Sequence, residues 1–104
     1  MRKLLAAAVL GALAASNALA DPPMIELARA RNCLACHSVD KKVLGPAYKA
    51  VAAKYANDAA APARLAKKVR EGGTGVWGKA VMPANPRVTE EEADKLVTWI
   101  LSLK

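Results

Sequence analysis

The chain has 104 residues, a formal net charge of +7 and no phenylalanine. This length allows one small domain, whose apolar core alone gives little stability margin. A basic protein can bind nucleic acid, but the export signal described next argues against that partner and favours an acidic protein or an anionic membrane surface. Because aromatic side chains are scarce, we expect a large apolar cofactor to complete the core; the four aromatic residues are Tyr48, Tyr55, Trp77 and Trp99.

Residues 1–20 have the profile of a secretory signal peptide. Two basic residues precede the apolar run Leu4–Ala15, and Ala18–Ala20 forms an A-x-A site, which predicts cleavage before Asp21. The run is shorter than the roughly 20 residues that a membrane-spanning helix needs. We therefore expect a periplasmic protein without stable membrane insertion, whose mature domain spans residues 21–104. Loss of two of the 16 basic residues leaves 14 against 9 acidic ones, a net charge of +5.

The mature sequence predicts an all-α domain, because its apolar residues recur at helical spacing and show no strand-like alternation. Three short helices are expected over Met24–Asn32, Ala47–Tyr55 and Pro62–Glu71, separated by loops rich in glycine and proline. Gly72 and Gly73 end the third of these helices.

A fourth helix follows Thr89, which forms a capping-box pattern with Glu92. The expected apolar face of this helix comprises Ala93, Leu96, Val97, Ile100 and Leu101. Short amphipathic helices are marginal alone, so we expect the first and last helices to pack on each other. Trp99 is predicted near their crossing, where the small residues Ala28 and Ala30 would allow a close approach.

The segment Cys33–His37 reads C-x-x-C-H, the attachment sequence for covalent haem. Two thiols at this spacing can add to the two vinyl groups of a porphyrin, and the next residue then places an imidazole at the iron. A redox-active disulfide would normally lie in a βαβ context, which this sequence lacks. A zinc site lacks a fourth ligand, and a structural disulfide would close too small a loop to stabilise much. The motif therefore favours haem.

The second axial ligand is predicted to be Met82. His37 is the sole histidine, so one subunit cannot supply two imidazoles. Met24 precedes Cys33 by nine residues on the same expected helix, about 13 Å along its axis. Met82 instead lies in a loop 45 residues after His37, stiffened by Pro83 and Pro86. Gap-filling in the core is the alternative role of this methionine.

Two further loop features have open interpretations. A backbone carbonyl of Gly45-Pro46 could accept the free N–H of His37 and fix the imidazole, although a simple turn explains the same residues. The indole N–H of Trp77 could reach a haem propionate, or the side chain could simply pack.

These segments, in this order and spacing, resemble the small class I bacterial cytochromes c of the c-551 and c-552 type. The resemblance covers essentially all of residues 21–104 and is carried by Cys33–His37, Val43–Ala47, Gly75–Gly78 and Met82–Asn85. It implies the cytochrome c fold, with four or five short helices wrapped around one covalently bound haem c.

The resemblance also implies roles for individual residues. Cys33 and Cys36 would form the thioether bonds, His37 and Met82 would be the axial iron ligands, and the Pro46 carbonyl would face His37. Trp77 would lie near a propionate, and the amide of Asn85 would approach the ligating sulfur. Lys68 stands where relatives have a propionate-binding arginine, and it lacks the bidentate fork of arginine. The proline-rich run of relatives is reduced here to Lys79-Ala80-Val81.

We therefore expect a periplasmic electron carrier, not an enzyme, and a monomer. Its partners would be periplasmic or membrane-bound redox proteins such as oxidases, reductases or a bc1-type complex, which it would meet through small transient interfaces. The docking lysines would be drawn from Lys41, Lys42, Lys49, Lys54, Lys67, Lys68 and Lys79. A haem-based sensor or ligand binder is the alternative, and a peroxidase is disfavoured because no distal acid or base is evident.

Overall fold

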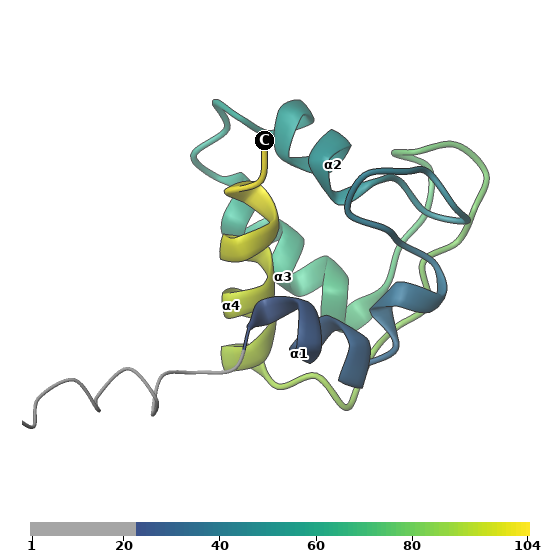
Figure 1. Cartoon of the computed structure of the whole chain (residues 1–104), viewed down its shortest axis with the longest axis vertical. Helices are drawn as coiled ribbons and strands as arrows, with labels where there is room; N and C mark the ends of the chain where they lie inside the picture. The colour runs from purple at the N-terminus through teal and green to yellow at the C-terminus, as the bar shows by residue number, and fades with distance from the viewer. Residues whose placement is uncertain (1–22) are drawn as a thin grey trace, which may run out of the picture.

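The computed structural model describes residues 23–104, so the predicted signal peptide lies outside the described residues. The elements are α1 (Met24–Ala30), a short 3-10 helix η2 (Cys33–Ala35), α2 (Tyr48–Lys54), α3 (Ala61–Glu71) and α4 (Glu90–Leu101). Within this range the only extended pairing is an isolated antiparallel bridge between Gly73 and Met82. The all-α prediction is confirmed (Figure 1). None of the helices described is long and apolar enough to span a bilayer.

The observed helix bounds differ from the expected ones by at most two residues at either end. The first helix ends at Ala30 rather than Asn32, because Asn32 adopts a left-handed backbone with φ of 66° and turns the chain into η2. Asparagine tolerates this conformation better than most residues. Pro62 lies in the first turn of α3, where its missing N–H leaves no helical hydrogen bond unmade.

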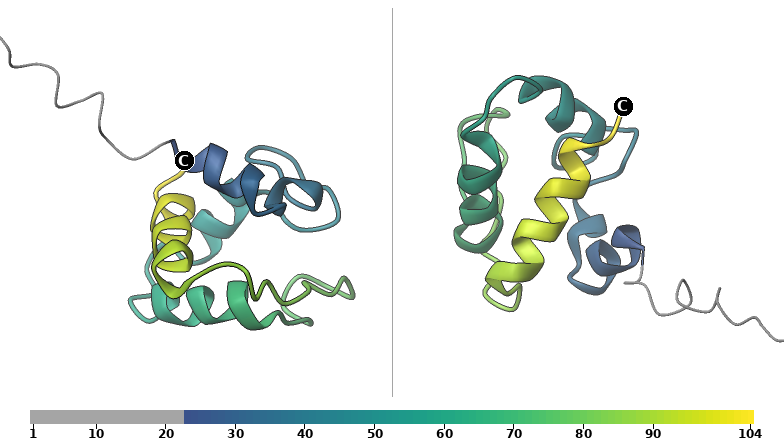
Figure 2. Two further views of the ribbon diagram at one scale, coloured as in Figure 1. Left: turned by 90° about the horizontal axis from the view of Figure 1, so that it is seen from below. Right: turned by 90° about the vertical axis from the view of Figure 1, so that its left-hand side faces the viewer.

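Helix α4 is the element on which the other helices pack. It contacts α1, α2 and α3, and Figure 2 shows it between α1 and α3. The predicted capping box is present: Thr89 Oγ1 accepts from Glu92 N at 3.1 Å, and Glu92 Oε1 accepts from Thr89 N at 3.2 Å. These two bonds satisfy donors that the start of a helix otherwise leaves open.

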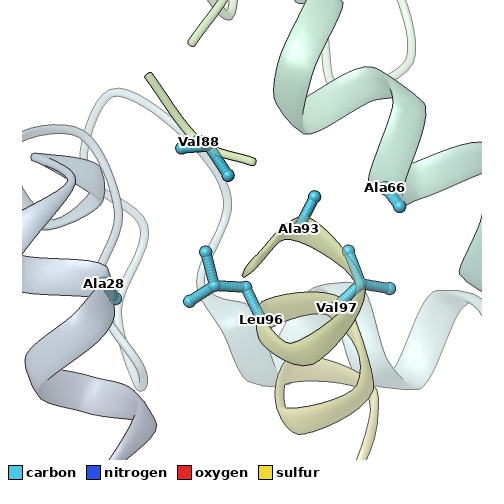
Figure 3. Close-up of a cluster of buried hydrophobic side chains, with 6 residues drawn as sticks. All are labelled: Ala28, Ala66, Val88, Ala93, Leu96 and Val97. Atoms are coloured by element: carbon cyan, nitrogen blue, oxygen red, sulfur yellow. The ribbon is translucent and has the colours of Figure 1, made fainter. Parts of the chain in front are cut away.

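The core is built mainly from small side chains where α1, α3 and α4 meet; its buried members are Ala28, Ala66, Val88, Ala93, Leu96 and Val97 (Figure 3). The expected packing of the first helix on the last is confirmed, and Ala28 is fully buried there. Ala30 is exposed, so its expected role was wrong. Two residues further along a helix correspond to about 200° of rotation, which turns Ala30 to the opposite side from Ala28.

Trp99 lies beside the start of α1, as its predicted place near the crossing requires. It lines a shallow surface depression together with Pro23 and Met24. The Trp99 ring also meets the ring of Tyr48 in α2 edge-on, with 5.7 Å between the ring centroids. Trp99 therefore connects α4 to both α1 and α2.

Two long loops leave this helical frame. One follows η2 and runs over residues 36–47, and the other joins α3 to α4 over residues 72–89. Figures 1 and 2 show both loops projecting on the same side of the helices. Every residue that the sequence singled out for chemistry lies in η2, in one of these loops, or in the adjoining α3.

Candidate functional site

The C-x-x-C-H segment is held in a tight turn. Its fold begins at Asn32 and continues through η2, where Cys36 N and His37 N both donate to the carbonyl of Cys33, at 3.2 and 3.0 Å. Cys33 and Cys36 are both free thiols and half-buried. Burial raises the pKa of the Cys33 thiol, and a hydrogen bond with Tyr48 opposes that rise. Cys33 therefore stays protonated at neutral pH.

The imidazole of His37 has a defined tautomer. Its Nδ1 lies 2.8 Å from the carbonyl oxygen of Pro46, so the acceptor that the sequence located in Gly45-Pro46 is present. A carbonyl can only accept, hence Nδ1 carries the proton of this bond, and the neutral imidazole then has its lone pair on Nε2. An imidazole arranged in this way is ready to bind a metal through Nε2.

Gly45 lies directly against the same imidazole. A Cβ at this position would lie 2.6 Å from His37 Cε1 and 2.9 Å from Nδ1, closer than real Cβ contacts. The backbone is drawn in by a 2.7 Å hydrogen bond from Gly45 N to the carbonyl of Cys36. The sequence marked Gly45 only as part of a turn or acceptor loop, whereas the structure requires glycine here for space.

Tyr48 is a site residue that the sequence analysis missed. It is only 4% exposed, and its ring stacks on His37 with centroids 5.0 Å apart and 25° between the planes. Burial raises the pKa of its phenol, and an interaction with the Cys33 thiol adds to that rise. The signal available in the sequence was its place at the start of the second helix, which does not reveal a long-range contact.

Met82 is fixed by its backbone rather than by a helix. Gly73 N donates to the Met82 carbonyl at 3.0 Å, and Met82 N donates to the Gly73 carbonyl at 2.8 Å. Gly72, with φ of 81°, permits this pairing, because a Cβ there would lie 2.6 Å from the Met82 carbonyl oxygen. The bridge closes the loop 74–81 at its base and leaves the Met82 side chain half-buried.

Asn85 joins the end of this loop to α3. Its backbone N donates to the carbonyl of Arg70 at 3.0 Å, and Nδ2 donates to the carbonyls of Val69 at 2.9 Å and Pro83 at 3.2 Å. These bonds satisfy carbonyls in the last turn of α3, which lack helical partners. An approach of the amide to the Met82 sulfur, as the resemblance implies, would compete with the longer bond to Pro83.

Lys68 and Trp77 lie along the same loop. The Cε and Nζ atoms of Lys68 come within 3.0 and 3.4 Å of where a Cβ on Gly73 would be, so its side chain passes over the base of the loop. Trp77 is 38% exposed, and the ammonium of Lys54 lies 5.6 Å from its ring centroid. That distance is within the range of a cation–π contact, which ties the loop to the end of α2.

The segment that ends α1 is anchored on α4 by a two-pronged ion pair. Arg31 Nε and Nη2 donate to the two carboxylate oxygens of Glu92, at 3.0 and 2.7 Å. Glu92 also accepts from Thr89 N, so the cap of α4 and the entry to the cysteine motif share one side chain. No local pattern in the sequence predicted this pairing, which spans 61 positions.

The structure thus groups the predicted site residues into two sets. Cys33, His37 and Pro46 come together around Tyr48, while Met82, Asn85 and Lys68 gather at the end of α3. Among residues 23–104, no group of three or more histidine, cysteine or acidic side chains is placed to hold a metal ion.

The surroundings of these two sets suit a large, flat, apolar group. The large hydrophobic residues that are exposed in the described chain all belong to the two loops; they are Val43, Leu44, Val76, Trp77 and Val81, with exposed fractions from 38% to 70%. The concentration of exposed apolar side chains in these two loops makes them the candidate binding surface. Two free thiols, an imidazole lone pair and a methionine thioether in the same region match the donor set for haem c.

The chain is similar in sequence and in structure to known proteins of one family. The sequence profile of the family described as "Cytochrome c" matches residues 26–104. The chain is 57% identical over 83 residues to cytochrome c2 of Rhodocyclus tenuis, covering 75% of this chain and 89% of the relative. It is 47% identical over 94 residues to cytochrome c-551 of Pseudomonas aeruginosa, covering 90% and 88%. The crystal structure of wild-type cytochrome c552 from Nitrosomonas europaea matches with a TM-score of 0.75 and 49% identity, covering 77% of this chain and 99% of that one.

Proposed function

This chain belongs to the cytochrome c family, and we propose that it carries single electrons between periplasmic redox partners through a haem iron held by His37 and Met82. Family membership makes it an electron-transfer protein with one covalent haem c, not an enzyme. Bound haem c supplies an iron that alternates between the ferrous and ferric states. Cys33 and Cys36 are the residues that hold the group through thioether bonds.

The observation that carries the proposal is the prepared imidazole of His37. The Pro46 carbonyl holds the proton on Nδ1 and directs the Nε2 lone pair outward from that bond. This hydrogen bond also raises the basicity of the ring as a ligand. The Gly73 bridge restrains the backbone of Met82, which lowers the entropy lost when its sulfur binds iron. With haem bound, His37 and Met82 would together hold the iron and would raise its reduction potential, which suits a carrier.

Three further residues complete the proposed site. Lys68 and Trp77 are assigned to the haem propionates, because an ammonium and an indole N–H both pair with carboxylates. Lysine supplies charge there without the fork of arginine. Asn85 is assigned to the Met82 sulfur: its bond to Val69 holds the amide at the end of α3, and its longer bond to Pro83 would break when the amide approaches the sulfur.

The surface formed by the two loops is the proposed docking site for partner proteins. This surface includes the exposed apolar side chains of the two loops, of which Leu44 and Val81 are the most exposed, at 66% and 70%. No ion pair of the described residues holds Lys41, Lys42 or Lys79, which lie in the same two loops. An apolar centre with a basic rim suits weak, transient docking on acidic surfaces. Lys49, by contrast, is paired with Asp40 at 2.6 Å.

The partners are proposed to be oxidases, reductases or a bc1-type complex reached from the periplasm. This location rests on residues 1–20, whose basic start, apolar run and A-x-A site support cleavage before Asp21. Mass spectrometry of the exported protein tests the cleavage, with Asp21 expected as the first residue.

Carbon monoxide binding tests the ligand set. The reduced, haem-loaded protein is expected to keep its optical spectrum under carbon monoxide at neutral pH, because Met82 fills the sixth position. Met82→Ala is expected to bind carbon monoxide readily, whereas the control Met24→Ala, at the start of α1, is expected to behave as wild type. Ready binding by the wild-type protein would overturn the carrier proposal in favour of a haem-based sensor or ligand binder.

A further inference from the structure

Tyr48 connects three parts of the molecule through one buried side chain. Its ring stacks on His37 at 5.0 Å and 25°, and meets Trp99 edge-on at 5.7 Å and 80°. Its hydroxyl group interacts with the Cys33 thiol. The residue begins α2, where its backbone N donates to the carbonyl of Ser38 at 2.9 Å. Both ends of the C-x-x-C-H segment therefore contact Tyr48.

The hydrogen bond to Pro46 leaves the tilt of the His37 imidazole ring unrestrained. A carbonyl oxygen accepts hydrogen bonds over a broad range of directions, so the 2.8 Å contact locates Nδ1 but constrains the tilt of the ring poorly. A nearly parallel neighbouring ring opposes such tilting, because tilting would break close contact over a whole face. Tyr48 supplies this neighbour, and Trp99 supports it from α4.

The hydroxyl group gives the tyrosine a second function. The hydroxyl group of this buried phenol interacts with the sulfur of Cys33, which is a weak hydrogen-bonding group. This choice links the first cysteine to the imidazole through one rigid ring. A phenylalanine would fill the same space and stack in the same way, but it would not restrain Cys33.

We propose that Tyr48 is a positioning residue that sets the plane of the His37 imidazole relative to Cys33, and hence the orientation of the axial ligand on the iron. The inference rests on the proposed role of His37 as that ligand. Plain core packing would account for the contact with Trp99, but it would not require a stacked geometry against the imidazole or a hydroxyl group on a sulfur.

The test compares haem-loaded Tyr48→Phe and Tyr48→Leu with wild type, using the proton NMR shifts of the haem methyl groups in the oxidised protein. These shifts depend on the orientation of the axial ligands and not on global stability. Tyr48→Phe keeps the stacked ring and loses only the hydroxyl group, so it is expected to shift the methyl resonances slightly without changing their order. Tyr48→Leu is expected to change the order. Tyr55→Leu removes a half-buried tyrosine from just beyond α2 and is expected to keep the wild-type order despite a lower melting temperature.

Two outcomes would overturn the inference. One is a wild-type methyl pattern in Tyr48→Leu, and the other is an equal change in Tyr55→Leu. If Tyr48→Leu does not accumulate, Trp99→Leu removes the support behind Tyr48 and is expected to shift the methyl resonances in the same direction, while an unchanged pattern would count against the inference. A wild-type protein that binds carbon monoxide, or lacks the spectrum of a low-spin iron, would instead reject the proposed ligand set.

Discussion

Gly45→Ala is the substitution whose effect follows most directly from the geometry of the site. The new methyl group would lie 2.6 Å from His37 Cε1, so the imidazole or the loop must move. Overpacking of this kind costs about 1–3 kcal/mol, and loss of the bond to Pro46 costs about 0.5–1.5 kcal/mol. The expected loss of stability is therefore about 2–4 kcal/mol, or about 10–25 °C in melting temperature for a domain of this size.

The assay pairs thermal unfolding of the haem-loaded protein with its reduction potential. We expect Gly45→Ala to lower the melting temperature and also to change the potential, because the imidazole shifts with the loop. Gly75→Ala is the matched control: its φ of 96° carries a backbone penalty, but no atom lies within 4 Å of the new methyl group. It is expected to lose some stability while its potential stays at the wild-type value. A Gly45→Ala protein that melts near wild type with an unchanged potential would refute the close-contact argument.

Three further predictions follow from other contacts. Gly72→Ala is expected to lose about 2–5 kcal/mol in denaturant unfolding and to admit carbon monoxide, because its methyl group would meet the Met82 carbonyl and its φ is positive. Hydrogen bonding to Arg31 holds the pKa of Glu92 below its ordinary value of 4.5. Glu92→Gln should therefore be less stable than wild type at neutral pH, and the difference should vanish as the pH falls through that lowered pKa. Lys79→Glu is expected to slow electron transfer to an acidic partner, most clearly at low salt.

Each of these predictions has a matched control. Gly78→Ala shares a positive φ of 101° with open space around it, so it should not admit carbon monoxide. Glu91→Gln removes a neighbouring carboxylate of α4 that does not contact Arg31, and its pH profile should follow that of wild type. Lys104→Glu makes the same charge change at the end of the chain, and it should alter the transfer rate less than Lys79→Glu. Equal effects in a variant and its control would contradict the corresponding contact.

The sequence alone was sufficient for features that depend on near neighbours in the chain. Cys33, Cys36 and His37 lie within five consecutive residues, and the capping box joins Thr89 to Glu92, three positions later in the chain. Helix periodicity likewise predicted the α-helices, because 3.6 residues per turn determine which side chains share a face. The Pro46 carbonyl was also within reach of sequence reasoning, since only nine positions separate it from His37.

Only the tertiary structure decided the contacts between distant segments. It paired Arg31 with Glu92, turned Ala28 inward and Ala30 outward, and bound the amide of Asn85 to the Val69 carbonyl near the end of α3. It also placed Tyr48 on the imidazole and Gly45 against its edge. Such contacts depend on how α4 orients the helices that pack on it and on how the loops return to them. The local sequence patterns of these segments are compatible with many packings of the helices and loops. The folded core determines which of these packings forms.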